Sequence, residues 1–406
     1  MTGDGWQHWA TPSGWGSIRA RLMTSSLGCS GGSPVFPRRG TETERRAGIS
    51  TLGRFSLTEI TTQGESWQSA IDATATLADA LLTLMERNRD RAVVFIGCGS
   101  THCLAQYAAP FFQRVTRRQC RGVPSSELLF QTDTVVAPGK PPLVIALSRS
   151  GETSETVMAV EKMRARGSDV LTISCYECTP LAGASSLTIT IPGGREQSFA
   201  QTRSFAGMLV AVQVLAAMTA SDAALLSAVE KLPALAPGIV ERARPLARSF
   251  GGDESYKRIT YLGSGPLYGL ASEATIKIKE MALSVAEPYR FMEFRHGPMA
   301  LVDQEHLVVA LLSDKVREYE VGVLREVKQS GGAVLIVANE DNGLGNEFDG
   351  LFALGTSLPE LARGVLYLPL VQLLAYYRAI ARGLNPDRPR NVVMAVRLKG
   401  TRMARE

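Results

Sequence analysis

Apolar runs alternate with helical patterns along most of this chain, and the whole alternation occurs twice. VVFIG from Val93 leads into a Gly-x-Gly turn and a helical pattern, and ITYLG from Ile259 does the same. Downstream, PLVIALS ending at Ser148 matches VVALLS ending at Ser313, and DVLTIS matches AVLIVA. The offset between the copies drifts only from 166 through 165 to 164 residues. We therefore interpret the chain as a duplicated domain with small insertions or deletions.

Short apolar runs separated by helical patterns of about 10–15 residues are typical of parallel sheets with crossover helices. Helices are expected within 56–90, at 102–114 and at 153–166, and a Pro-containing hinge is expected at 233–245. The apolar stretch 207–220 is too short to span a membrane, so a buried helix is expected there. The predicted fold class is α/β, with one parallel sheet flanked by helices in each of two tandem domains.

The predicted organisation has four parts. Residues 1–55 form a disordered basic extension, 56–235 a first domain that binds phosphate, 236–390 a second domain, and 391–406 a C-terminal tail. The extension carries a net charge of +4 of the total of +5, because seven Arg face three acidic residues there. The rest of the chain is nearly neutral, which gives no argument for a nucleic-acid partner.

The six cysteines do not suggest a disulfide framework. Cys175 and Cys178 form a Cys-x-x-Cys pair, but no second pair or nearby His completes a zinc site. We therefore expect reduced thiols, no metal and a cytoplasmic protein without a membrane segment.

The strongest local motif is SRSGET, residues 148–153, between a buried strand and a predicted helix. Free backbone N–H groups, the positive end of a helix and three hydroxyls in six residues suit a phosphate monoester. The alternative is a capped helix without a ligand, but capping accounts for only one of the hydroxyls. The turn GCGST, residues 97–101, would close this cradle from the neighbouring strand.

The second copy lacks the cradle and carries charge on its first helix instead. Glu273, Lys277 and Glu280 stand at i, i+4 and i+7, so they share one helix face. The plain interpretation is an exposed Glu–Lys pair. His296 follows in a Phe-Arg-His-Gly-Pro turn, and a lone His is more often structural than catalytic.

These motifs together resemble the sugar isomerase (SIS) family of phosphosugar-binding domains in its double-domain form, over about residues 55–398. The similar segments are LTEITTQ (57–63), GCGST, SRSGET, EQSFAQTRSF (196–205), EATIKIKEMALSVAEPY (273–289), EFRHGPMALVD (293–303) and QLLAYYRAIARGLNPDRPRN (372–391). The run from Glu273 to His296 is similar to the isomerase half of glucosamine-6-phosphate synthase. SRSGET, GSGPLYGLA and FRHGP are similar to bacterial galactosamine/tagatose-6-phosphate deaminase–isomerases. The resemblance implies two tandem flavodoxin-like domains.

The resemblance also implies a role for each matching residue. Glu280 would be the general base that moves a proton between C1 and C2 of an open-chain sugar, and His296 would open the ring, often from a partner subunit. Glu273 and Lys277 would position and charge-balance the site, and the backbone of Phe199 and Ala200 would line the sugar. The implied phosphate-binding positions are Ser148, Arg149, Ser150, Thr153, Ser100 and Thr101.

Two departures from the synthase restrict the predicted reaction. The synthase has a glutaminase domain with an N-terminal Cys nucleophile, whereas Met1 is followed here by Thr2 and a tail. Its C-terminal Schiff-base Lys is matched by Met394, with Lys399 five residues further on. We therefore expect no glutamine-dependent amination. The expected enzyme is a homodimeric aldose–ketose isomerase that releases amine from a glucosamine- or galactosamine-6-phosphate, without a cofactor. A fructosamine-6-phosphate deglycase and a non-catalytic phosphosugar sensor are the alternatives.

Overall fold

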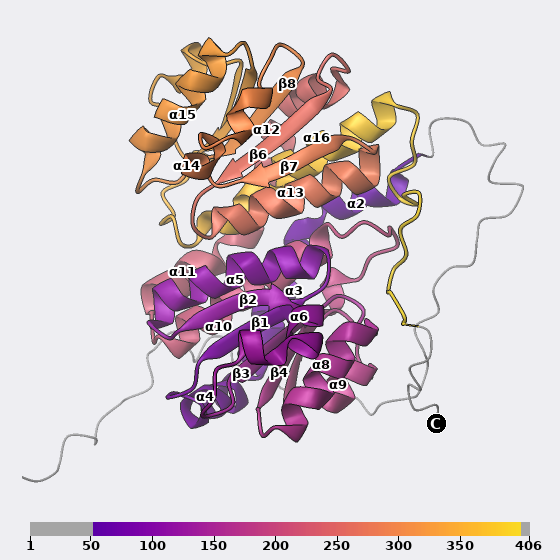
Figure 1. The fold of residues 1–406 in the computed structure, drawn as a ribbon, viewed down its shortest axis with the longest axis vertical. Helices are drawn as coiled ribbons and strands as arrows, with labels where there is room; N and C mark the ends of the chain where they lie inside the picture. Colours follow the sequence, from indigo (N-terminus) through magenta and orange to yellow (C-terminus); the bar gives the residue numbers. More distant parts are fainter. Residues whose placement is uncertain (1–51, 399–406) are drawn as a thin grey trace, which may run out of the picture.

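Each copy of the repeated pattern forms one five-stranded parallel sheet in the computed structural model, which describes residues 52–398 (Figure 1). The predicted extension therefore lies outside the described residues up to residue 51, and so does the end of the chain from residue 399. The two sheets belong to two lobes that follow one another along the long axis of the molecule.

The first sheet has the strand order β2-β1-β3-β4-β5, the flavodoxin-like order. Its strands are β1 (Val93–Gly97), β2 (Cys120–Pro124), β3 (Leu143–Ser148), β4 (Val170–Ser174) and β5 (Leu187–Thr190). The three central strands are buried at every residue, because helices cover both faces of a parallel sheet. This explains why their sequences are continuous apolar runs.

The second sheet repeats this topology, with the order β10-β9-β8-β6-β7. Its strands are β6 (Arg258–Gly263), β7 (Val285–Tyr289), β8 (His306–Leu311), β9 (Ala333–Ala338) and β10 (Gly350–Ala353). The predicted α/β class and the two tandem flavodoxin-like domains are therefore confirmed. The edge strands β2 and β7 were not predicted, because their mixed and partly exposed sequences lack an apolar run.

Helices surround both sheets. Those up to the end of the first sheet are α2 (Arg54–Thr61), α3 (Gln63–Thr76), α4 (Ala78–Arg87), α5 (Ser100–Thr116), α6 (Ser125–Phe130), α7 (Thr132–Val135), α8 (Ser154–Ala165) and α9 (Pro180–Ala184). The others are α10 (Arg203–Thr219), α11 (Ala223–Glu230), α12 (Leu232–Gly252), α13 (Leu267–Ala282), α14 (Phe291–Phe294), α15 (Arg317–Gln329) and α16 (Leu368–Ala381). Short 3₁₀ turns are η3 (Pro192–Gly194), η4 (Pro298–Leu301), η5 (Leu344–Asn346) and η6 (Arg363–Tyr367).

Two details of the predicted organisation are wrong. Ile96 pairs with Ala146 and Leu262 with Ala310, so the third strands are offset by 164 residues and Ser148 corresponds to Leu312 rather than Ser313. The hinge expected at 233–245 is instead the first part of the continuous helix α12, with Pro237 and Pro245 inside it. Packing along α16 holds α12 together despite the backbone hydrogen bonds that these prolines cannot make.

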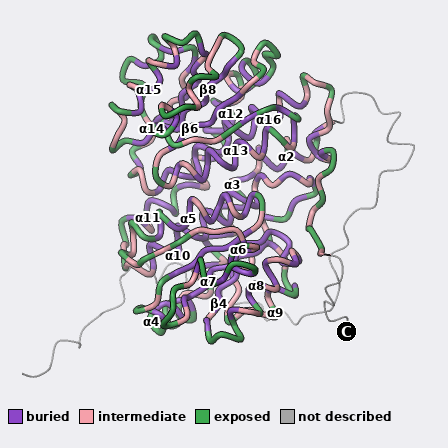
Figure 2. The backbone as a smooth tube through the Cα atoms, in the orientation of Figure 1, coloured by how far each residue is buried: buried purple, intermediate pink, exposed green. Residues whose placement is uncertain are grey.

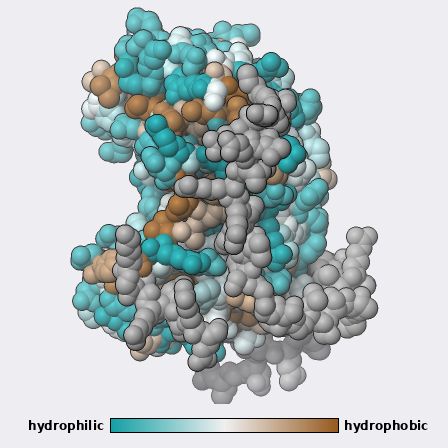
Figure 3. Space-filling view, turned by 90° about the vertical axis from the view of Figure 1, so that its right-hand side faces the viewer, coloured by the Kyte–Doolittle hydropathy of each residue, from teal (hydrophilic) through white to brown (hydrophobic). Residues whose placement is uncertain are grey.

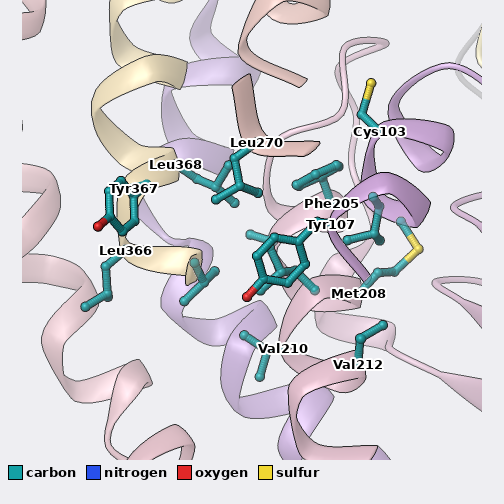
Figure 4. Packing of buried hydrophobic residues seen from close by; sticks show 14 of the residues in the cluster. Cys103, Tyr107, Phe205, Met208, Val210, Val212, Leu270, Leu366, Tyr367 and Leu368 are labelled. Atoms are coloured by element: carbon teal, nitrogen blue, oxygen red, sulfur yellow. The ribbon is translucent and has the colours of Figure 1, made fainter. Parts of the chain in front are cut away.

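A core of helices joins the two lobes. Tyr107 of α5, Phe205 and Met208 of α10 and Leu270 of α13 converge in it (Figure 4). Gly269 brings α13 against α5, since a Cβ atom there would lie 2.4 Å from the backbone nitrogen of Tyr107. The buried part of the chain runs without a break through this region (Figure 2). The two lobes therefore share one hydrophobic core.

The two ends of the described chain cross between the lobes. Helix α2 lies beside α16, although the remainder of the first lobe follows it in sequence (Figure 1). The segment after α16 returns to the first lobe, where Ser154 N donates to Val396 O at 3.2 Å. Within residues 52–398, the helical stretch Arg363–Ala381 has the length and apolar composition of a membrane span, but 83% of it is buried. The predicted helix at 207–220 is confirmed as the buried helix α10.

Candidate functional site

SRSGET lies where ligands of open parallel sheets usually bind. The loop follows β3, and the turn GCGST follows its neighbour β1, from which the chain runs to opposite sides of the sheet. This is the topological switch point of the first sheet. Gly151 has φ +66°, and a Cβ atom there would lie 2.2 Å from the Thr179 hydroxyl oxygen, so the loop requires glycine.

The three hydroxyls of the loop differ in the hydrogen bonds that they make. Ser148 Oγ accepts from Gly151 N at 3.1 Å, and Ser150 Oγ accepts from Glu152 N at 3.2 Å. Accepting these bonds leaves each hydroxyl proton available to a ligand. Thr153 is the N-cap residue of α8, but its side chain makes no capping bond. The alternative of a merely capped helix therefore does not account for these three hydroxyls.

Two predicted phosphate ligands are engaged within the protein. Thr101 Oγ1 donates to Cys98 O and accepts from Cys98 N, both at 2.9 Å, and so stabilises the turn. Arg149 lines the cavity described below, but its guanidinium pairs with Glu196 at 3.0 Å, with both side chains buried.

The three charged residues of α13 form a buried chain of ion pairs. Lys277 Nζ lies 2.6 Å from Glu280 Oε2 and 3.5 Å from Glu273 Oε1. Lys277 and Glu273 are almost fully inaccessible, whereas the Glu280 side chain keeps 25% of its exposure. These residues are therefore not an exposed surface pair.

Burial determines the charge state of this chain of ion pairs. Desolvation raises the pKa of Glu273 to about 8, against the opposing effects of Lys277 and of the Ser100 hydroxyl. The neighbouring carboxylates raise the pKa of Lys277 despite its own burial. At neutral pH, this favours a protonated Glu273 beside a Lys277 ammonium ion that pairs with the Glu280 carboxylate.

A cavity of about 300 Å³ brings Glu280 and the phosphate cradle together. It is lined by GCGST residues 98–101, by Ser148–Ser150 and Thr153, by Phe199 and Gln201, by Glu280, and by residues 391–396. A carboxylate of the second domain therefore lines the same cavity as the SRSGET loop of the first. Glu273 and Lys277 lie behind Glu280 and do not line the cavity, and Ala200 is likewise buried behind Phe199.

His296 is not brought to this cavity within one chain. The residue is exposed after α14, and it lies outside the cavity lining. The surrounding segment also exposes large apolar side chains, with Val285 66% and Leu301 58% exposed. One described chain thus combines the cradle with Glu280 and leaves His296 exposed on the second lobe, outside this cavity.

The C-terminal segment is part of the cavity wall, which sequence analysis did not predict. Met394, at the position of the synthase Lys, lines the cavity, and Lys399 lies outside the described residues. Arg397 pairs with Glu152 of the SRSGET loop at 2.8 Å, and Leu398 N donates to Ser154 Oγ at 3.2 Å. The match to a family Lys was the only sequence signal that pointed to this segment.

The second sheet has a smaller counterpart of the cavity. This hollow of about 130 Å³ lies beside Ser264–Leu267, the turn that corresponds to GCGST. Its wall includes Tyr107, Phe111 and Arg114 of α5, which correspond, at an offset of 166, to Glu273, Lys277 and Glu280. The carboxylates of α13 thus have no counterpart at the matching positions of α5, and the carboxylate that lines this hollow, Glu360, comes from a different part of the chain.

Another hollow lies away from the candidate site. A larger groove of about 750 Å³ between α3 and β5 has Glu65, Asp72 and Glu177 in its wall, and it shares no residue with the cavity at the cradle. Polar side chains cover much of the face seen in Figure 3, where apolar patches lie near the waist and on the upper lobe.

Comparison with known proteins agrees with this geometry. The family model of the SIS domain matches residues 87–218 and 254–377. The protein assigned as D-galactosamine-6-phosphate deaminase AgaS of Streptomyces coelicolor is 30% identical over 355 residues, which cover 82% of this chain and 90% of that protein. The glucosamine-6-phosphate deaminase structure from Thermotoga maritima superposes with a TM-score of 0.67 at 25% identity, over 81% of this chain and 99% of that one.

A longer relative is the isomerizing glutamine–fructose-6-phosphate aminotransferase of Sulfurisphaera tokodaii. It is 28% identical over 345 residues, which cover 84% of this chain and 56% of the relative. The chain thus spans about half the length of this relative.

Proposed function

Because the chain belongs to the SIS domain family, we propose that it is a phosphosugar enzyme that isomerises an aminosugar 6-phosphate and releases its amine. The carrying observation is the cavity in which Glu280 of the second domain faces the hydroxyls of SRSGET in the first. A glucosamine- or galactosamine-6-phosphate deaminase must bind the phosphate at one end of its substrate and transfer a proton at the other end.

The proposed mechanism assigns the phosphate to Ser148, Ser150 and Thr153, supported by Ser100 and the Thr101 turn. With the phosphate held there, the Glu280 carboxylate removes the C2 proton of the open-chain 2-amino aldose and returns it to C1. A second proton passes from the C2 amine to the carbonyl oxygen O1, so the aldehyde becomes an alcohol and the amine becomes an imine. Water then hydrolyses the imine, which releases ammonia and leaves the ketose phosphate.

Lys277 and Glu273 support this role of Glu280. The Lys277 ammonium ion, 2.6 Å from Glu280, compensates the charge of a carboxylate that is largely removed from water. A protonated Glu273, whose Oε1 atom lies 3.5 Å from Lys277 Nζ, adds no second negative charge to this buried cluster. Met394 lines the cavity where the resembling synthase has its Schiff-base Lys, and a thioether cannot form that bond. This supports amine release rather than amination.

The proposal includes a cytoplasmic homodimer. The exposed His296 and the apolar side chains near it support a dimer in which His296 enters the partner's cavity. The burial of the apolar segment Arg363–Ala381 supports its assignment as a core helix.

Incubation with a panel of phosphosugars tests the function. Ammonia and ketose phosphate should appear from glucosamine 6-phosphate or galactosamine 6-phosphate, and neither should appear from the unphosphorylated sugars. A fructosamine 6-phosphate that releases its amine instead would identify a deglycase. If the protein bound a phosphosugar of the panel tightly but converted none of them, the proposed enzymatic activity would be contradicted, and the protein would be a phosphosugar sensor.

A further inference from the structure

Glu59, in the LTEITTQ motif, has no part in the mechanism above, yet it is buried against the cavity loop. Its Oε1 atom accepts from Gln197 N at 2.5 Å and from Ser198 N at 3.2 Å, and its other oxygen accepts from Ser198 Oγ. Glu59 belongs to α2, which lies 138 residues before this loop. A helix that packs beside the second lobe thus holds the backbone just before Phe199.

Glu196 holds the other end of the same loop. Its Oε1 atom accepts from Thr202 N at 2.6 Å and from Ser204 N at 3.1 Å, and Oε2 accepts from Ser204 Oγ at 2.6 Å. Between these two carboxylates lie Phe199 and Gln201, which line the cavity. The path of the cavity wall at this point is therefore set by backbone bonds to two buried carboxylates.

Arg149 supplies a counter-charge for Glu196 and also contacts the loop that Glu59 holds. Its Nη1 atom donates to Glu196 Oε2 at 3.0 Å and to Ser198 O at 3.4 Å, and Nη2 donates to Met394 O at 3.4 Å. The side chains of Arg149 and Glu196 are 3% and 0% exposed. An isolated buried carboxylate is costly, so the arginine is required where Glu196 is charged.

We propose that Glu59, Glu196 and Arg149 form a carboxylate clamp that positions residues 197–202 against the sugar end of the substrate, and that the Arg149 side chain is not a phosphate ligand. The identity of the ligand rests on the proposed function. The clamp itself rests on the hydrogen bonds that hold the loop. All three are positioning residues, because they act through the backbone of the loop.

Amide hydrogen exchange tests the clamp without any substrate. Glu59→Gln keeps the size of the side chain but replaces one of its two acceptor oxygens by an amide nitrogen that can only donate, so exchange at Gln197 and Ser198 should become faster by about tenfold or more. Glu65→Gln is the matched control, because Glu65 is an exposed carboxylate on the next helix. Unchanged exchange at Gln197 and Ser198 in Glu59→Gln would overturn the proposal.

Binding of two probes then tests the role of Arg149. Inorganic phosphate reports on the cradle alone, whereas glucosamine 6-phosphate reports on the cradle and the sugar end. Arg149→Gln/Glu196→Gln removes both charges of the pair together, which avoids leaving one buried charge unpaired. Its Kd for glucosamine 6-phosphate should rise about tenfold or more, while its Kd for inorganic phosphate should change less than about twofold.

The Ser150→Ala/Thr153→Ala variant is the control, because it should weaken the binding of both inorganic phosphate and glucosamine 6-phosphate. If the Arg149→Gln/Glu196→Gln variant lost as much affinity for inorganic phosphate as this control, Arg149 would be a phosphate ligand. That result would overturn the proposal. If the unaltered protein bound neither probe, the proposed function would fail, and the exchange measurement would still decide whether the clamp exists.

Discussion

Glu280 differs from its two charged neighbours on α13 because it alone of the three reaches the cavity wall. It keeps a quarter of its side-chain exposure and a 2.6 Å contact with a buried ammonium ion. A carboxylate in this setting has access to substrate and a fixed orientation. This access and this contact distinguish Glu280 from Glu273 and Lys277, which do not line the cavity.

Replacing Glu280 by Gln should remove proton transfer and leave the fold and the cradle intact. General bases contribute a factor of about 10² to 10⁴ in rate, so kcat should fall by that factor while the Kd for the phosphosugar changes little. Steady-state kinetics and calorimetry would measure both. Glu254→Gln, at an exposed carboxylate, is the control. A loss of less than tenfold in Glu280→Gln would assign Glu280 a structural role.

Glu273 should leave a signature in the pH dependence of stability. Its pKa is about 8 in the folded protein and about 4.5 as an ordinary carboxyl, so between these values the folded state binds a proton that the unfolded state has lost. The contribution of Glu273 to stability therefore falls as the pH rises from about 4.5 to about 8. Glu273→Gln cannot titrate, so its stability relative to the unaltered protein should increase over this range.

Urea unfolding at pH 5, 7 and 8.5 would measure this difference. Because other buried carboxyl groups such as Glu59 titrate in both proteins, only the difference between the two curves reports on Glu273. Parallel curves would mean that Glu273 is already ionised in the folded state.

At the level of elements, the contact between α5 and α13 places the carboxylates of the second domain at the cradle of the first. Gly269 permits this contact, since a Cβ atom there would lie 2.4 Å from Tyr107 N and 2.7 Å from Cys103 O. Both neighbours are backbone atoms, so they cannot move aside cheaply. Gly269 thus sets the distance between α5 and α13.

Gly269→Ala should therefore destabilise the protein by about 1–3 kcal/mol through overpacking, although alanine is the better helix former. Gly238→Ala in α12 is the matched control, because no atom lies within 4 Å of its added Cβ. That substitution should stabilise the protein by about 0.5–1 kcal/mol. Thermal and urea unfolding would compare the two variants. Equal effects would show that α5 and α13 can separate without cost.

The elements that follow from local pattern were predictable, and those that depend on distant residues were not. Apolar runs predicted β1, β3 and β4, and the hydroxyl-rich motif after β3 predicted the cradle. The edge strands β2 and β7 lack such a run. Arg149 pairs with Glu196, 47 residues away in the sequence. Met394 of the cavity wall contacts Arg149 across 245 positions. No local pattern reports contacts of this range.

At the scale of the whole molecule, the predicted homodimer accounts for the position of His296. The exposed His296 lies on the second domain, outside the cavity of its own chain. If His296 completes the partner's cavity, a hybrid of His296→Ala and Glu280→Ala subunits contains one site with both residues intact.

Each variant alone should be nearly inactive, whereas the mixture should recover up to about one quarter of the activity if subunits exchange at random. Activity assays after verified subunit exchange would measure the recovery. Mixing either variant with itself is the control. No recovery would place His296 in the site of its own chain or outside catalysis.

The crossing of the two chain ends also has a consequence for synthesis. Asp387 Oδ1 accepts from Ser56 N at 2.7 Å and from Ser56 Oγ at 2.8 Å, so the start of α2 is fixed by a residue 331 positions later. Glu59 of the same helix holds the cavity loop. While the ribosome is still making the second lobe, the first lobe therefore lacks the contacts with Asp387 that fix the start of α2. The nascent chain can complete its cavity only after residues 391–396 emerge, and this late step follows from the long sequence separation of the contacts.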